Sequence, residues 1–260
     1  MRKLVTYAVV ITTIVWSLGL AAVVPASAAY APAAGDLIKT ANDSAVYYID
    51  ADNKRVLFVN AVTFWSWYGG DWSSVTMGND TMSIQTISQE DFDDLDVGGH
   101  VIVRPGSELI KFANSPRVYA VTPGGELRAV VASSGDDTVA KALYGDDYSV
   151  VTIQNGFESD YTKGDALTVD SSLPDGSLVK YEGSEDIYYI QDGDKRVIAD
   201  DAFMANGFAD SSVVTVPTSM TYSDGESVTE AEGDLTTVSG GTTPVVASGS
   251  MSVSMSSMTP

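Results

Sequence analysis

The residues best suited to bind a ligand are aromatic and gather in one short stretch of the chain. Trp65, Trp67 and Tyr68 stand close together, and Trp72 follows them. Sugars stack on exposed aromatic faces, so Trp65, Trp67 and Tyr68 are candidate glycan-binding residues. Aromatic side chains are also common core residues, and Phe203 takes a comparable place further along the chain. The sequence favours the core for Trp72 and for at least one of Trp65 and Trp67, with a glycan platform as the alternative.

Four aspartates occupy matching places in two turns and are candidate metal ligands. Asp50 and Asp52 lie in one turn, and Asp192 and Asp194 lie in the other. Calcium takes oxygen ligands from loops of this kind. The spacing differs from the EF-hand pattern, and unpaired aspartates are common in the turns of an acidic chain. The sequence therefore favours solvated turns, leaves calcium as the alternative, and indicates no other cofactor.

The chain offers little for catalysis. It has one histidine, His100, and no cysteine. A serine or cysteine triad would thus have a single base, and no nucleophile motif lies near it. The carboxylates are too many to single out the pair that a glycosidase needs. We therefore expect a protein that is not an enzyme, with His100 partly exposed at the edge of a strand.

The elements that position these side chains recur three times. An aliphatic and lysine phrase is each time followed by an aromatic or β-branched run: Leu37-Ile38-Lys39 before Val46, Leu109-Ile110-Lys111 before Val118, and Leu178-Val179-Lys180 before Ile187. The copies are offset by 72 and then by 69 residues. A fixed period of this length is the mark of a repeat architecture. The first copy also carries an insertion, Thr76 to Gln85, between two strand segments.

Each repeat predicts a β-hairpin, a short helix and two further strands. Turn residues join the hairpin strands at 50–53, 122–125 and 191–194. The expected helices, each closed by a glycine, are 61–68, 136–144 and 200–205. A final strand is expected at 100–103 in the first copy and at 166–169 in the second. The predicted class is mainly β with short helices (α+β), and the short connections permit either a closed, pseudo-threefold arrangement or an extended row.

The two ends of the chain differ from the repeats. Arg2 and Lys3, an apolar run and the small-residue site Pro25-Ala26-Ser27-Ala28 predict a signal peptide over 1–28. A linker over 29–34 then precedes repeats at 35–105, 106–174 and 175–238. The segment 239–260 is rich in Ser, Thr and Gly, as flexible linkers are, and we expect a further domain beyond it. We expect an exported protein with no membrane span after cleavage. The alternative is an uncleaved membrane anchor, because the apolar run is long enough to span a bilayer.

The charge of the chain limits the classes of partner that it can bind. Removal of residues 1–28 leaves 12 Lys and Arg against 35 Asp and Glu, a formal charge of −23. Nucleic-acid binding needs clustered basic residues, so this composition excludes it. Without cysteine, an exported chain must be held together by core burial or by metal ions.

The repeat phrase resembles one found in exported bacterial surface proteins. It reads G-x-L-[IV]-K, then V-Y-Y-I, a turn, K-R-V and F-x-S-W-x-G-x-D-x-S-x-V, and it resembles the tandem repeat of S-layer-like proteins of Patescibacteria. Residues 35–71 match best, 175–214 match well, and 106–153 have lost most of the aromatic residues. The resemblance implies repeats that precede a Ser/Thr-rich linker and β-sandwich domains, and it implies no catalytic residue.

These observations lead to two functional hypotheses. The first is a secreted or cell-surface structural protein, an S-layer-like scaffold or attachment region, whose partners are the cell envelope or copies of itself. The second is a glycan- or peptidoglycan-binding module of a larger exported enzyme. Because three copies of one unit form a surface more readily than a single asymmetric catalytic constellation, the repeat favours the first hypothesis.

Overall fold

The computed structural model describes residues 30–69 and 83–240. The described residues from Pro32 onward belong to one compact unit. The predicted signal peptide, Trp72, residues 76–82 of the insertion and most of the C-terminal linker lie outside the described residues.

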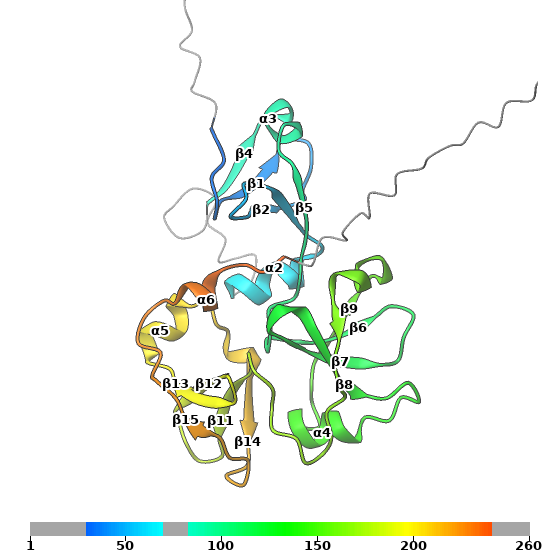
Figure 1. Ribbon diagram of the computed structural model, residues 1–260, viewed down its shortest axis with the longest axis vertical. Helices are drawn as coiled ribbons and strands as arrows, with labels where there is room; N and C mark the ends of the chain where they lie inside the picture. Colours follow the sequence, from blue (N-terminus) through cyan, green and yellow to red (C-terminus); the bar gives the residue numbers. More distant parts are fainter. Residues whose placement is uncertain (1–29, 70–82, 241–260) are drawn as a thin grey trace, which may run out of the picture. The chain divides into compact units, whose positions relative to one another are not determined.

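Three five-stranded sheets organise the described chain, and they share one strand order (Figure 1). The first sheet has the order β4-β1-β2-β3-β5 and consists of β1 (Leu37–Thr40), β2 (Tyr47–Ile49), β3 (Arg55–Phe58), β4 (Ile84–Ile87) and β5 (Val97–Val101). The second has the order β9-β6-β7-β8-β10 and consists of β6 (Leu109–Phe112), β7 (Val118–Thr122), β8 (Glu126–Val131), β9 (Val150–Ile153) and β10 (Thr162–Lys163). The third has the order β14-β11-β12-β13-β15 and consists of β11 (Leu178–Tyr181), β12 (Ile187–Gln191), β13 (Asp194–Val197), β14 (Val213–Val216) and β15 (Ser223–Asp224). The prediction of a mainly β fold with three similar units and short helices is confirmed.

In each sheet the three central strands pair antiparallel, and each of the two edge strands pairs in parallel with its neighbour. The predicted unit lacks the strand that comes first along the chain. The aliphatic and lysine phrase forms this strand, β1, β6 or β11. Its leucine pairs in parallel with an aliphatic residue of the strand after the helix, in the pairs Leu37 with Ile84, Leu109 with Val150, and Leu178 with Val213. Aliphatic side chains pack well on a pleated surface, and all three leucines are buried. The phrase therefore joins the hairpin to the rest of the sheet.

The helices agree closely with the prediction. Helices α2 (Ala61–Tyr68) and α5 (Asp200–Ala205) coincide with the expected ranges, and α4 (Thr138–Tyr144) begins two residues late. At the start of α2 the side chain of Asn60 accepts the N–H of Thr63 at 2.8 Å, and Gly69 follows its end with a φ of 64°. The other short helices are α3 (Gln89–Asp93), η1 (Pro123–Gly125), η2 (Asn155–Asp160), η3 (Asp210–Ser212) and α6 (Gly233–Thr236). Of the helices in the described ranges, none is both long enough and apolar enough to cross a membrane.

The final strand of the second repeat is shorter and lies earlier than expected. Strand β10 covers Thr162–Lys163, whereas the predicted range was 166–169. The N–H of Leu167 still bonds to the carbonyl of Ala129 at 2.9 Å, but no regular ladder continues to it. Gly164 and Asp165 interrupt the ladder, since both residue types are disfavoured in strands.

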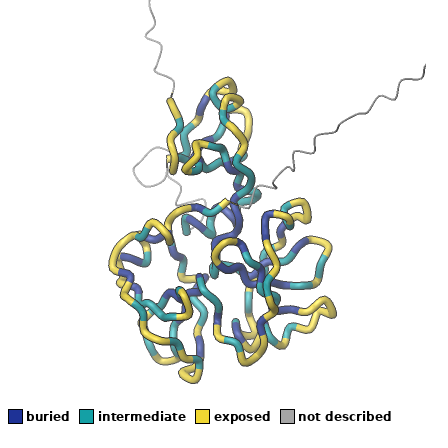
Figure 2. The backbone as a smooth tube through the Cα atoms, viewed as in Figure 1, coloured by how far each residue is buried: buried dark blue, intermediate teal, exposed yellow. Residues whose placement is uncertain are grey.

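The repeats bury apolar side chains together. Figure 2 shows buried positions along the strands and exposed positions mainly in the turns. Val179 and Val216 of the third sheet share one buried cluster with Leu109 of the second. Ile102 and Val103, which follow β5 of the first sheet, are buried with residues of the second. Because a unit of this size buries little apolar surface alone, such shared cores are what hold it folded.

The turn that opens the second repeat generates the first prediction. Gly106 has a φ of +72°, and a Cβ there would lie 2.0 Å from the carbonyl oxygen of Gly176. Gly124 has a similar φ of +76° but open space around it. We expect Gly124→Ala to lower the free energy of unfolding by about 1 kcal/mol through backbone strain alone. Gly106→Ala must also displace backbone, and we expect it to cost about 3 kcal/mol.

Urea unfolding of the two variants checks this prediction. Gly124→Ala is the control for φ strain, because the two glycines differ in their surroundings and hardly in φ. Equal losses of stability in both variants would mean that the contact between Gly106 and Gly176 is not close.

Candidate functional site

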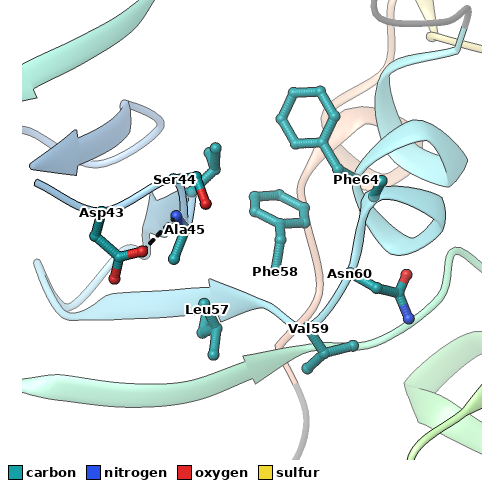
Figure 3. Close-up of a pocket in the computed structure, with 10 residues that line it drawn as sticks. Asp43, Ser44, Ala45, Leu57, Phe58, Val59, Asn60 and Phe64 are labelled. Atoms are coloured by element: carbon teal, nitrogen blue, oxygen red, sulfur yellow. Dashed lines mark hydrogen bonds between the residues drawn. The ribbon is translucent and has the colours of Figure 1, made fainter.

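A cavity of about 330 Å³ lies beside helix α2 in the first repeat (Figure 3). Phe58 and Phe64 line it, and their rings meet edge to face with centroids 5.1 Å apart. Three polar side chains also line it, Asp43, Ser44 and Asn60, and the first and last are engaged within the chain. The carboxylate of Asp43 accepts the N–H of Ala45 at 3.0 Å, and Asn60 caps α2. The cavity therefore presents mainly apolar surface.

The three predicted glycan-binding residues pack beside this cavity and do not line it. Trp67 is 6% exposed, and its indole N–H donates to the carbonyl of Ile102 at 2.9 Å. Trp65 and Tyr68 are half-buried, and each ring centroid lies 4.8 Å from that of Phe64. Burial raises the pKa of the Tyr68 hydroxyl. These aromatic faces contact protein, so their clearest role is in the core of the first repeat.

The predicted metal ligands serve the turns in which they lie. A carboxylate oxygen of Asp50 accepts the N–H groups of Asp52, at 2.9 Å, and Lys54, at 2.8 Å. Asp192 takes a left-handed φ of 55° in the turn that leads to Asp194 at the start of β13. Within the described ranges, no three histidine, aspartate or glutamate side chains are grouped so that they could hold a metal ion. The calcium site stays a prediction.

His100 forms a contact between the first and second repeats that the sequence did not predict. Its Nδ1 lies 2.9 Å from Oδ2 of Asp160, whose side chain is buried, and its ring meets Phe157 edge to face. Burial raises the pKa of the Asp160 carboxyl, and the neighbouring His100 partly offsets this effect. Burial of the Asp160 carboxylate is energetically costly, and the pair of His100 and Asp160 holds β5 against η2.

Arg104 forms the most extensive polar contact between repeats. Its side chain is buried and donates to the carbonyl oxygens of Gly207 at 2.9 Å and Leu235 at 2.7 Å. A third, longer bond of 3.4 Å reaches the carbonyl of Trp67. The guanidinium also lies over the ring of Phe208, 4.3 Å from its centroid. One side chain thus links the end of α2 to two segments of the third repeat.

The chemistry of arginine explains why it occupies this place. Burial lowers the pKa of Arg104 to about 10, which still leaves the side chain charged at neutral pH. Its rigid fork of N–H donors can serve several carbonyl groups at once, and a guanidinium stacks on aromatic rings. The sequence gives one signal of this role. Arg104-Pro105 ends the first repeat, whereas Leu173-Pro174 ends the second, so an arginine replaces a buried aliphatic residue.

The chain matches no protein-family model, and it has no significant match among curated proteins.

The contacts of Arg104 generate the second prediction. Arg104→Met keeps a long side chain but leaves the carbonyl groups of Gly207 and Leu235 without their donor. We expect it to lower the free energy of unfolding by about 3 kcal/mol, because each buried polar group without a partner is costly. Arg104→Lys, which keeps the charge and loses the fork, should lie between Arg104→Met and the unsubstituted chain.

Arg128→Met is the matched control, measured by the same denaturant unfolding. In the unsubstituted chain the Nε of Arg128 donates to the carbonyl of Asp165 in an exposed contact within the second repeat. We expect this substitution to cost at most about 1 kcal/mol. If Arg104→Met and Arg128→Met were equally stable, Arg104 would not hold the repeats together.

Proposed function

We propose that this chain is an exported cell-surface structural protein whose three repeats form a scaffold or attachment region. The observation that carries the proposal is the repetition of one five-stranded sheet in three copies with shared buried cores. Equivalent sheets with shared cores suit a load-bearing or surface-covering role. We propose no catalytic activity for it.

The way in which the described residues use their reactive groups supports this proposal. Asp50 shapes a turn, Trp67 is buried in the core, and the one histidine of the chain binds a buried carboxylate. Each of these side chains stabilises the fold, and two of them, Asp50 and Trp67, were candidate ligand-binding residues. A structural role accounts for all three.

The sequence supports the compartment in which we place the protein. Residues 1–28 have the basic, apolar and small-residue order of a signal peptide. A charge of −23 from residue 29 onward would keep a crowded surface protein soluble. The resemblance to the repeats of S-layer-like proteins of Patescibacteria adds to this support.

Immuno-electron microscopy of intact cells that produce the protein tests the proposal and is the third prediction. We expect a continuous and abundant label on the cell surface, and no surface label for a variant that lacks residues 1–28. Scarce protein that is recovered with purified cell wall would instead support the peptidoglycan-binding module of a larger exported enzyme. Label confined to the cytoplasm would contradict both functions.

A further inference from the structure

A second cavity, of about 370 Å³, lies between the second and third repeats. The turn that opens the second repeat, the residues after α4 and the segment that leads into β14 line it. This size is typical of sites for small ligands. Because two repeats build it, no single repeat contains the whole cavity.

The charged groups that line this cavity are all negative. They are the carboxylates of Glu108 and Asp147, and no lysine, arginine or histidine lines it. Neither carboxylate forms an ion pair with any basic side chain of the described ranges. Glu108 is half-buried, and burial raises the pKa of its carboxyl, while a hydrogen bond from Ser149 partly offsets this effect. A partly desolvated acid without a cation is costly, and a cationic ligand would relieve that cost.

Two tyrosines add aromatic surface to the lining of the cavity. Tyr144 and Tyr148 both line the cavity and are partly buried. The hydroxyl of Tyr148 lies 3.4 Å from a carboxylate oxygen of Asp137, which helps to fix the ring. Aromatic faces attract cations, and the hydroxyl groups of Ser107 and Ser211 add further acceptors to the lining.

We propose that this cavity binds an organic cation that carries a primary ammonium group, as in a lysine side chain or an amino sugar. The ammonium group would donate to Glu108 and Asp147, and its carbon atoms would lie against the tyrosine rings. A neutral sugar would leave both carboxylates without a compensating charge. A metal ion fits less well, since no group of three acidic or histidine side chains lies close enough together in the described ranges. This inference is independent of the proposed scaffold function.

Calorimetric titration of the full chain tests the proposal and is the fourth prediction. The probes are Nα-acetyl-lysine methylamide and glucosamine, and their neutral counterparts are Nα-acetyl-norleucine methylamide and N-acetylglucosamine. We expect at least one ammonium probe to bind, to bind more tightly than its neutral counterpart, and to weaken as salt screens the charges. The probe that binds distinguishes a peptide source from a sugar source.

Substitutions in the cavity localise the binding. We expect Glu108→Gln to weaken it about tenfold or more, because a charge-assisted hydrogen bond is lost. Asp147→Asn is the second variant, and because Asp147 is exposed we expect this substitution to leave the fold intact. Glu182→Gln, an exposed substitution that does not line the cavity, is the control and should bind as the unsubstituted chain does.

Three results would overturn the proposal. The first is binding of the ammonium probes no tighter than that of their neutral counterparts. The second is full binding by both Glu108→Gln and Asp147→Asn. The third is an equal loss of binding in Glu182→Gln, which would indicate a general effect of negative charge. None of these results would bear on where the protein lies in the cell, so the scaffold proposal is judged separately.

Discussion

The described structure depends on one buried guanidinium. Arg104 binds carbonyl groups of Trp67, Gly207 and Leu235, which lie far apart in the sequence. Carbonyl groups inside a protein need donors, and no other type of side chain offers so many from one point. The arginine also lies over the ring of Phe208 and so combines polar and aromatic contacts. Arg104 therefore attaches the third repeat to the connection between the first two.

The other contacts between repeats are smaller and of different kinds. Apolar clusters join the second sheet to its neighbours, and the pair of His100 and Asp160 fastens the first repeat to the second. At Gly106 and Gly176 two connecting turns approach so closely that a side chain would not fit. The second repeat thus shares core residues with both of its neighbours, and the first repeat forms polar contacts with both of the others.

Sequence patterns predicted the helices and turns, which depend on neighbouring residues, and missed the contacts between residues that lie far apart in the chain. The glycine after each helix and the turn residues of each hairpin depend on neighbouring positions, and α2 and α5 were therefore placed correctly. The partners of Arg104 are backbone carbonyls, which no residue identity reveals. Asp160 lies 60 residues from His100, and one aspartate among many carries no mark of burial. The cavity beside Glu108 depends on how two repeats pack, which a repeat period does not specify.

The contacts between the repeats should make all three unfold as one unit, and equilibrium unfolding in urea measures whether they do. From residue 29 onward all tryptophans lie in the first repeat, so tryptophan fluorescence reports on that repeat alone. Far-ultraviolet circular dichroism reports on all three sheets. We expect both signals to change at the same urea concentration, as in a cooperative unit. Two separate transitions, with the first repeat unfolding independently of the others, would contradict it.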